Sequence, residues 1–309
     1  MKLVIVGGVA GGASAAARAR RLAEDAEIVV FERGPDVSFA NCGLPYYVGG
    51  TIANRQSLLV TSPERLRTRF RIDVRTRSTV TAIDRTAKTV RVHDLGSGRE
   101  YDEGYDALLL APGAAPLKPP VPGVDSTRVV TLRNLEDVDR IKARVDEALA
   151  GTGGRIVVVG AGFIGLELAE NLVHRGLDTT VVELQAQVLP PLDPEMTSPI
   201  VQTLRSHGVR LLLGDSAVGF EERPEGLLVH LASGGAIGAD LVILGVGVRP
   251  ESQLARDAGL DVVACPTDGP VAHAHVVGDP ARSGDSHRAP VVRDEVRREG
   301  AAWRGDLAD

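Results

Sequence analysis

Two segments of the chain repeat one another, and this repeat constrains the fold more than any other feature. One copy begins at Lys2 and reads KLVIVGGVAGGASAAARARRLAEDAEIVVFERG; the other begins at Arg155 and reads RIVVVGAGFIGLELAENLVHRGLDTTVVELQ. Each copy has the pattern of an apolar strand, a glycine turn, a helix and a second strand that ends on an acidic residue. The repeat therefore predicts two α/β units of the same kind.

The second copy carries the complete glycine pattern of a dinucleotide-binding turn. Gly160, Gly162 and Gly165 form GxGxxG directly after an apolar, β-branched run. The first glycine allows a tight turn, the second lets the backbone approach a pyrophosphate, and the third lets helix and strand pack closely. Glu183 closes the next strand 23 residues beyond Gly160, where a carboxylate accepts hydrogen bonds from a ribose. This copy predicts a Rossmann-like unit.

The first copy has an incomplete version of the same pattern. Gly7 and Gly12 occupy the outer glycine positions, but Val9 stands where the second glycine is expected. Glu32 follows Gly7 after 25 residues. Alone, this turn could equally be an ordinary connection between a strand and a helix. Two copies in one chain favour an enzyme that binds two dinucleotides and passes electrons between them.

The segments between and after the copies suggest how the two units are connected. The stretch LLLAPGAAPLKPPVPG covers Leu108–Gly123, and its prolines should deny the chain a regular ladder, so we place a crossing there. The stretch DLVILGVGVRPE from Asp240 should return the chain to the first unit. Alternating patterns in Asp73–Val92 and Leu211–Leu231 predict small accessory meanders.

Composition and charge disfavour several classes of protein. A net charge of −6 and only 3% aromatic residues argue against a nucleic-acid partner. No apolar run approaches the ~20 residues of a membrane span, and Met1 leads directly into a strand, so we expect a cytoplasmic protein without export signal. Cys42 and Cys265 lie 223 positions apart in a protein for which we expect no export, which argues against a structural disulfide framework. No metal site is predicted.

Cys42 is the strongest candidate for a reactive group. It lies in SFANCGLPYYVGG, from Ser38 to Gly50. A cysteine often packs simply as a small buried hydrophobe. Here Gly43 and Pro45 favour a turn that opens into a helix, and a helix N-terminus stabilises the thiolate that attacks disulfides.

Four stretches together resemble the coenzyme A disulfide reductases, in the single-cysteine branch of the pyridine nucleotide-disulfide oxidoreductases. They are SFANCGLPYYVGG, VGGVAGGASAA, TLRNLEDVD and VVVGAGFIGLELAENL, and the resemblance covers about residues 1–260. It implies that the first unit binds FAD, that the second binds NADH or NADPH, and that Cys42 lies against the flavin. Electrons would pass from nicotinamide to flavin and then to a mixed disulfide between Cys42 and coenzyme A.

The resemblance also assigns domains and site residues. It implies two Rossmann-like domains: a FAD-binding part at 1–115 and an NAD(P)H-binding domain at 116–245, followed by a return segment at 246–280 and an irregular tail at 281–309. Ser38 and Asn41 would line the thiol pocket. Arg18 and Arg21 would meet the charged nucleotide part of coenzyme A, although a solvated helix face is an equally good interpretation. The expected cofactor contacts are Gly7, Gly8, Val9, Ala10, Gly12, Glu32, Arg33, Ala111, Pro112, Gly113, Gly160, Gly162, Phe163, Ile164, Gly165, Glu167, Glu183, Gly245, Gly247 and Asp279.

Two further questions of chemistry depend on single residues. A lone cysteine also serves the NADH oxidases and peroxidases, which cycle it through a sulfenic acid, so this alternative stays open. Glu183 favours NADH over NADPH because a carboxylate repels a 2′-phosphate, and no arginine follows within Leu184–Gln187. Glu167 completes GxGxxGxE, but it could also be an ordinary acid in the first helical turn.

The last 49 residues, 261–309, differ in character from the rest. They contain one leucine, Leu307, and no isoleucine or phenylalanine, so they cannot build an ordinary core. HVVGDPA, at 275–281, resembles the family's second flavin motif, in which Asp279 would meet the ribityl chain. We expect the family's interface domain to be missing, through a frameshift or truncation, which makes dimerisation doubtful. An inactive nucleotide-binding remnant is therefore a third interpretation.

Overall fold

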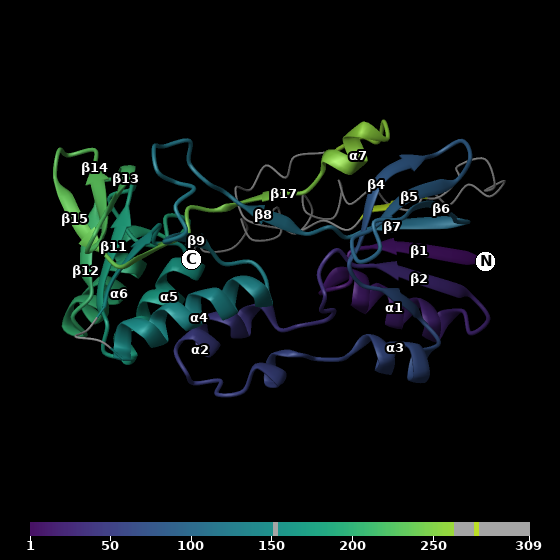
Figure 1. The fold of residues 1–309 in the computed structure, drawn as a ribbon, viewed down its shortest axis with the longest axis horizontal. Coiled ribbons are helices and arrows are strands. Elements are labelled where there is room, and N and C mark those ends of the chain that lie inside the picture. Colours follow the sequence, from purple (N-terminus) through teal and green to yellow (C-terminus); the bar gives the residue numbers. More distant parts are fainter. Residues whose placement is uncertain (151–153, 263–274, 278–309) are drawn as a thin grey trace, which may run out of the picture. The chain divides into compact units, whose positions relative to one another are not determined.

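The first sheet forms around the N-terminal strand of the chain. The computed structural model describes residues 1–150, 154–262 and 275–277. The five strands of the first sheet lie in the order β18 (His275–Val277), β7 (Ala107–Leu110), β1 (Lys2–Val6), β2 (Glu27–Phe31) and β3 (Asp73–Arg75). β1 pairs in parallel with β2 and β7, and β2 pairs in parallel with β3 (Figure 1).

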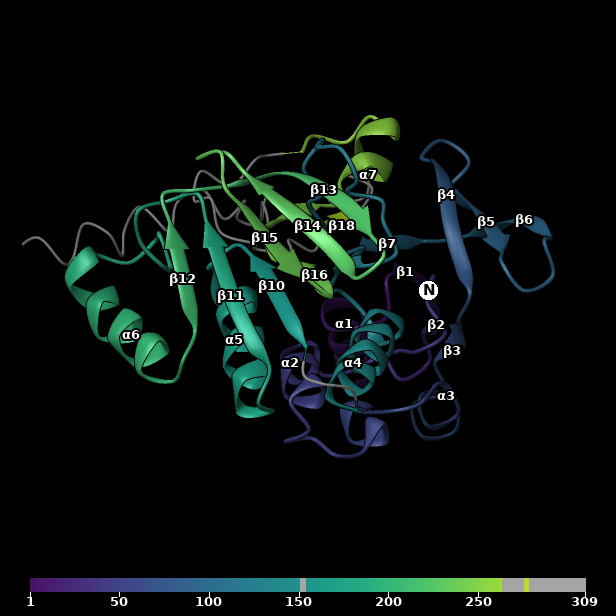
Figure 2. The same cartoon turned by 60° about the vertical axis from the view of Figure 1, so that its left-hand side comes forward.

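The second sheet repeats this arrangement. Its five strands lie in the order β12 (Arg210–Leu213), β11 (Asp178–Glu183), β10 (Arg155–Val159), β16 (Leu241–Leu244) and β9 (Val129–Thr131), all paired in parallel. The unit β1–α1–β2 corresponds to β10–α5–β11, where α1 spans Gly11–Leu22 and α5 spans Phe163–His174. Figure 2 shows α5 beside β10 and β11. The prediction of two Rossmann-like α/β units is confirmed.

Each helix packs according to the apolar stripe in its sequence. α1 is rich in alanine, and Ala13 and Ala16 are buried, so the helix lies close to its sheet. In α4 (Leu135–Ala150), Val138, Ile141 and Val145 follow the helical repeat and are completely buried. The other described helices are η1 (Asn41–Gly43), α2 (Leu44–Val48), η2 (Arg55–Leu58), α3 (Pro63–Phe70), α6 (Pro194–Ser206) and α7 (Gln253–Asp257). None of the described helices is both long enough and apolar enough to span a membrane.

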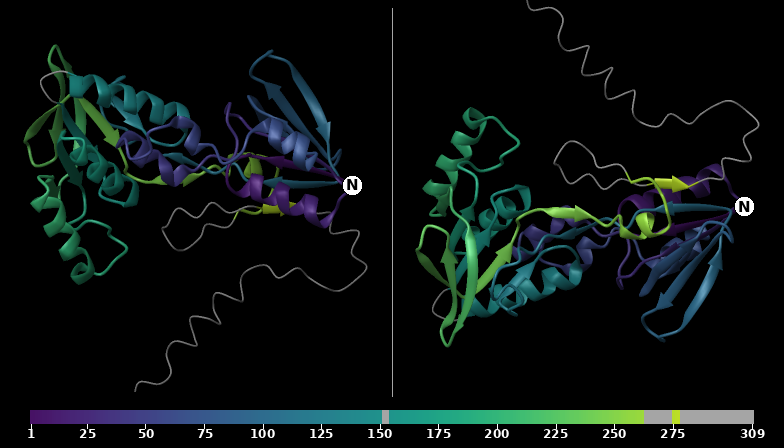
Figure 3. Two further views of the ribbon diagram at one scale, coloured as in Figure 1. Left: turned by 90° about the horizontal axis from the view of Figure 1, so that it is seen from below. Right: turned by 90° about the horizontal axis from the view of Figure 1, so that it is seen from above.

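Two antiparallel meanders accompany the sheets, as the alternating patterns predict. One contains β4 (Ser78–Asp84), β5 (Thr89–Asp94) and β6 (Glu100–Gly104); the other contains β13 (Ala217–Arg223), β14 (Gly226–Leu231) and β15 (Ala236–Ala239). Figure 3 shows both from two sides. The predicted start of each meander was wrong, because β3 and β12 instead extend the parallel sheets. Each follows a helix, α3 or α6, which supplies the crossover that a parallel strand requires.

Two short strands cross between the sheets. β8 (Ala114–Pro116) pairs antiparallel with β17 (Val248–Pro250), in the stretches where we predicted a crossing and a return (Figure 1). The expectation that prolines would exclude a regular ladder here was wrong. A two-stranded ribbon consists only of edge strands, where a proline can face away from the ladder. Apart from Val277 at the end of β18, both sheets lie within one compact unit, Met1–Val276.

Candidate functional site

The first glycine turn is closed by contacts that only glycine permits. Gly7 has a φ of +95°, and a Cβ there would lie 2.0 Å from the carbonyl oxygen of Ala111. A Cβ on Gly12 would lie 1.7 Å from the oxygen of Gly7. These contacts bring the carboxyl ends of β1 and β7 together at the start of α1, and they place Pro112 beside the turn. Val9 is half-buried and Ala10 is exposed at the N-cap of α1.

Glu32 clamps this turn from the end of β2. Its carboxylate accepts hydrogen bonds from the backbone N–H of Gly8, at 2.8 Å, and from that of Gly34, at 2.7 Å. Gly113, with a φ of +78°, completes the Ala111–Gly113 turn after β7. The predicted residues of the first turn therefore form one group at the carboxyl edge of the first sheet, where open α/β sheets bind their ligands.

The second glycine turn has the same construction. Gly160 has a φ of +105°, and a Cβ there would lie 2.4 Å from the oxygen of Gly245. A Cβ on Gly165 would lie 2.0 Å from the oxygen of Gly160. A Cβ on Gly162, by contrast, would meet nothing within 4 Å. The free space at the second glycine, at the N-cap of α5, is what the approach of a pyrophosphate requires.

Glu183 clamps the second turn as Glu32 clamps the first. Its carboxylate accepts hydrogen bonds from the N–H of Ala161, at 2.6 Å, and of Gln185, at 2.8 Å. The side chain is buried, yet each carboxylate oxygen has a second lone pair that a ribose hydroxyl can use. The two copies of the sequence repeat therefore share the same hydrogen bonds between a carboxylate and the backbone of the glycine turn.

Other predicted residues lie around the second turn. Phe163 is 63% and Ile164 is 38% exposed at the start of α5, so both side chains are accessible to a ligand at this turn. Gly247, with a φ of +113°, lies on the loop after β16. Glu167 is half-buried on α5; burial, and then the charge of Glu170, raise the pKa of its carboxyl group.

Cys42 lies on a short segment that begins at the first glycine turn. Ser38 has a φ of +48°, and its N–H donates to the Gly8 oxygen at 3.0 Å. Asn41 and Cys42 are exposed in η1, and α2 follows directly with Pro45 in its first turn. This geometry confirms the predicted turn that opens into a helix. Because Cys42 is exposed, it does not pack as a small buried hydrophobe.

The predicted substrate arginines lie on the exposed side of α1. Arg18 and Arg21 are both exposed, and Arg21 Nε donates only to the Ala17 oxygen of its own helix, at 3.3 Å. A shallow hollow of about 300 Å³ lies beside Arg21 and is lined by Arg20, Arg21, Glu24, Arg69, Phe70 and Arg71.

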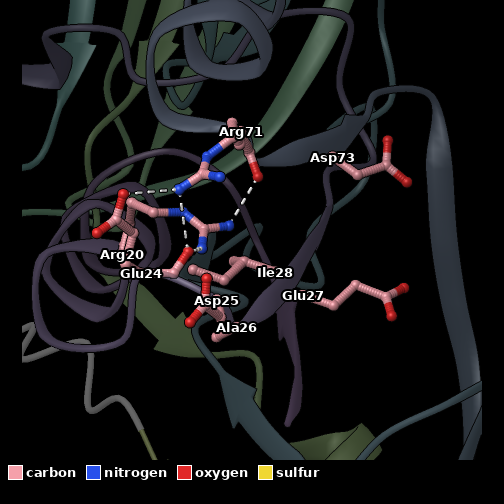
Figure 4. A pocket seen from close by; sticks show the side chains of 8 residues that line it. All are labelled: Arg20, Glu24, Asp25, Ala26, Glu27, Ile28, Arg71 and Asp73. Atoms are coloured by element: carbon pink, nitrogen blue, oxygen red, sulfur yellow. Dashed lines mark hydrogen bonds and ion pairs between the residues drawn. The ribbon is translucent and has the colours of Figure 1, made fainter.

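A second hollow, of about 330 Å³, shares part of this lining (Figure 4). Within it, Arg20 donates to the backbone oxygens of Phe70, Arg71 and Glu24. The guanidinium of Arg20 thus caps the last turns of α1 and α3, and it is a structural group.

Sequence reasoning missed a set of ion pairs beside the first turn. Arg133 donates to the Pro112 oxygen at 3.3 Å and to the Glu251 carboxylate at 2.5 Å. Arg33, predicted as a cofactor contact, pairs with the same carboxylate at 3.2 Å. The sequence signals only the start of α4, where Asn134 and Asp137 in TLRNLEDVD accept one another's backbone N–H groups. No local pattern indicates that Arg133 or Arg33 pairs with Glu251.

One predicted site residue, Asp279, and the second cysteine of the chain cannot be placed. Asp279 and Cys265 lie outside the described residues. Within the described part of the chain, no group of three or more His, Cys, Asp or Glu side chains could hold a metal ion.

The comparison with known families decides which proteins share this arrangement. Residues 1–270 match the model of the pyridine nucleotide-disulphide oxidoreductases. The chain belongs to this family. Members of the family are oxidoreductases that bind FAD and NAD(P)H.

Relatives in this family include enzymes of two kinds. The coenzyme A disulfide reductase of Staphylococcus haemolyticus is 37% identical over 259 residues, which cover 84% of this chain and 57% of that protein. The crystal structure of reduced Bacillus anthracis CoADR-RHD is 47% identical, with a TM-score of 0.81 over 85% of this chain and 46% of that chain. The water-forming NADH oxidase of Lactobacillus brevis, bound to NADH, is 36% identical, with a TM-score of 0.78 over 83% of this chain and 56% of that one. The chain thus spans about half the length of these relatives.

Proposed function

We propose that this protein passes electrons from NADH through FAD and Cys42 to coenzyme A disulfide or a related small disulfide. One observation carries the proposal: two equivalent glycine turns, each clamped by a carboxylate, occur in a chain whose exposed Cys42 lies on a segment anchored to the first turn. Two dinucleotide sites and one accessible thiol are the parts that such a reaction needs.

Each of the two glycine turns would bind one of the two cofactors. The first turn, with Gly7, Gly12 and Glu32, would hold FAD, together with the Ala111–Gly113 loop. The second turn, with Gly162 and Glu183, would hold NADH. The acidic side chain of Glu183 and the absence of arginine from Leu184–Gln187 support NADH over NADPH, because a 2′-phosphate would find repulsion and no partner.

Cys42 would act as the nucleophile. Its thiolate attacks one sulfur of the disulfide, a mixed disulfide forms, and the other sulfur leaves as a thiolate. A bound flavin would supply the two electrons that, with one proton, reopen the mixed disulfide. The second thiol is then released and the Cys42 thiolate is restored. Ser38 and Asn41, on the same segment, would position the disulfide.

The basic hollow beside α1 supports a charged substrate. Arg21, Arg69 and Arg71 line it, with Glu24 as the single acid. Guanidinium groups bind phosphates well because their donors match the geometry of phosphate oxygens. We propose that Arg18, Arg21 and their neighbours hold the phosphates of coenzyme A.

A second candidate is an NADH oxidase or peroxidase. The similarity to the Lactobacillus brevis oxidase favours it, and so does the exposed thiol of Cys42, which could cycle through a sulfenic acid. The two reactions differ in the electron acceptor and require the same cofactors.

The experiment compares the wild-type protein with Cys42→Ser. Yellow purified protein would report bound flavin, and NADH consumption is then measured with coenzyme A disulfide, with oxygen and with peroxide. We expect consumption with the disulfide, and we expect Cys42→Ser to lose it while NADH still bleaches the flavin. Disulfide reduction that survives in the variant would refute the proposal. Consumption with oxygen or peroxide alone would favour the oxidase, and colourless, inert protein would indicate an inactive remnant.

A further inference from the structure

The cysteine segment buries its apolar side chains against the helices of the second sheet. The segment runs from Asn41 to Leu59 and contains η1, α2 and η2. α2 contacts both α4 and α5. The segment's buried leucines and valine belong to the same core cluster as buried residues of those two helices: Leu44, Val48 and Leu58 with Val138, Ile141, Leu168 and Leu172. The buried apolar side chains of the segment are therefore packed against the fold that we assign to NADH.

A close contact fixes the end of α2 on α5. A Cβ on Gly49 would lie 2.0 Å from Oδ1 of Asn171. Asn171 is almost completely buried, and its Nδ2 donates to the Glu167 oxygen one turn earlier in α5, at 2.8 Å. The amide group therefore cannot turn away without losing a buried hydrogen bond. Gly49 is the residue that lets α2 approach α5 this closely.

Arg175 caps the carboxyl end of the same short helix. Its Nη1 donates to the Val48 oxygen at 3.2 Å and to Asp146 Oδ1 at 2.7 Å. Asp146, on α4, also pairs with Lys142, whose ammonium group lies 5.5 Å from the centre of the Tyr47 ring. A guanidinium at a helix C-terminus satisfies free carbonyl groups and complements the negative end of the helix dipole. α2 is thus held at its end by both α4 and α5.

The segment is also held at η2, by one residue of α4 and by one residue that precedes the segment. Arg55, in η2, donates to Asp139 of α4 at 2.8 Å and to Asp36, before the segment, at 3.2 Å. The Ser38 N–H bond to Gly8 is the contact with the first glycine turn.

We propose that α5 positions Cys42, with Asn171 and Arg175 as positioning residues that act through α2. α5 begins at Phe163, immediately after the Gly160–Gly162 turn, and Arg175 follows its last residue. One helix therefore runs from the proposed pyrophosphate site of NADH to the contacts that hold the cysteine segment. The kinetic part of this inference rests on the proposed function; the structural part does not.

The first test measures amide hydrogen exchange in the full chain. The reporters are the N–H groups of Gly49, Gly50 and Ile52, which bond to oxygens within α2. In Arg175→Gln we expect them to exchange about tenfold faster, as the loss of one charge-assisted hydrogen bond implies. Arg175→Lys, which retains a charge and donors, should stay within about threefold of wild type. Arg144→Gln, which removes an exposed pair with Glu147 on α4, should change nothing.

Unchanged exchange of these reporters in Arg175→Gln would overturn the inference. An equal acceleration in β1 and β2 of the first sheet would also overturn it, because the loss would then be one of global stability.

A second pair of variants tests the close contact. Gly49→Ala forces the new methyl group against Asn171 and should displace α2, so its reporters should exchange at least tenfold faster, by roughly the cost of overpacking. Asn171→Gly in the same chain removes the Oδ1, Cγ and Cβ atoms that the methyl group would meet, and it should recover most of the protection. Equal exchange in the single and double variants would contradict a positioning contact between Gly49 and Asn171.

A kinetic readout separates this inference from the proposed function. If the wild type reduces coenzyme A disulfide, Arg175→Gln should lower kcat by about tenfold while KM for NADH is unchanged, because the Gly160–Glu183 turn is intact. A higher KM for NADH with unchanged kcat would contradict positioning of Cys42. If the wild type reduces no disulfide, the proposed function fails, and the exchange experiment still decides whether α5 holds the segment.

Discussion

Ser38 combines a strained backbone with a proposed contact to substrate. Its φ of +48° lies in the left-handed region, which costs a residue with a Cβ of the order of 1 kcal/mol. Two backbone hydrogen bonds hold it there: its N–H donates to Gly8, and its oxygen accepts from Val60 at 2.9 Å. Strain of this kind persists where the surrounding structure enforces it, and here it turns the chain from the first glycine turn toward Cys42.

Two substitutions separate the backbone role of Ser38 from that of its hydroxyl group. Ser38→Gly should stabilise the protein by about 0.5–1 kcal/mol because glycine accepts this φ freely, whereas Ser38→Ala should leave the free energy of unfolding nearly unchanged. Both remove the hydroxyl, so both should raise KM for the disulfide by a similar factor. Urea unfolding and steady-state kinetics measure the two effects. A KM that rises in only one variant would show that the backbone, and not the hydroxyl, governs substrate binding.

At the scale of elements, the glycines of the second turn differ in role: one is needed for packing and another leaves space for a ligand. Gly165 lies under the oxygen of Gly160, where a Cβ would come within 2.0 Å, so this glycine is needed for folding. Gly162 has an ordinary φ of −76° and open space around the position of a Cβ. Its lack of a side chain has no consequence for packing and would matter only when a dinucleotide binds.

Alanine at each position should therefore give opposite phenotypes. Gly165→Ala should destabilise the protein by about 2–3 kcal/mol, since helix and strand must move apart. Gly162→Ala should unfold within about 0.5 kcal/mol of wild type, yet weaken NADH binding, because its methyl group enters the space of the pyrophosphate. Urea unfolding and NADH titration of the purified variants measure both. Normal NADH affinity in Gly162→Ala would exclude this turn as the pyrophosphate site.

The elements that the sequence predicts are those with local patterns. The β1–α1–β2 and β10–α5–β11 units follow from apolar periodicity and glycine spacing, and so does the position of Glu32 and Glu183 at strand ends. The sequence predicted a ribose contact for Glu183, and the hydrogen bonds of both carboxylates to the turns are seen only in the structure. The packing of α2 on α4 and α5 has no such pattern. Gly49 and Asn171 lie 122 positions apart, and nothing near Gly49 in the sequence indicates which side chain it faces. β3 and β12 were misassigned for a similar reason, since a short alternating strand fits a meander and a parallel sheet equally well.

At the scale of the whole molecule, Glu251 joins segments from both sheets. Its carboxylate pairs with Arg33, which follows β2, and with Arg133, which precedes α4. Its backbone N–H donates to the Gly113 oxygen at 2.9 Å. Glu251 follows β17, so this joint lies at the crossing that connects the two sheets. The relative placement of the two proposed dinucleotide sites would depend on such contacts, because hydride transfer tolerates little misplacement.

The ion pairs of Glu251 should make the free energy of unfolding decrease as the pH falls into the acid range. Burial alone raises the pKa of Glu251, but the hydrogen bond and charge of Arg133, with the charge of Arg33, outweigh it, so the pKa lies below its ordinary value. A carboxyl group with a depressed folded-state pKa contributes stability above its unfolded pKa of about 4.3, and this contribution is lost as pH falls through the folded-state pKa.

Glu251→Gln should therefore destabilise the protein at neutral pH and much less in acid. At pH 7 we expect a loss of about 1–2 kcal/mol, because two guanidinium groups lose a partly buried partner. Below about pH 4 the difference should shrink toward zero, since the wild-type carboxyl group is then increasingly protonated. Urea unfolding across this range measures it, with Glu147→Gln, which breaks an exposed pair with Arg144, as the control that should stay within about 0.5 kcal/mol of wild type. A gap between Glu251→Gln and wild type that persists undiminished in acid would mean that side-chain packing, and not the charge of Glu251, holds the crossing.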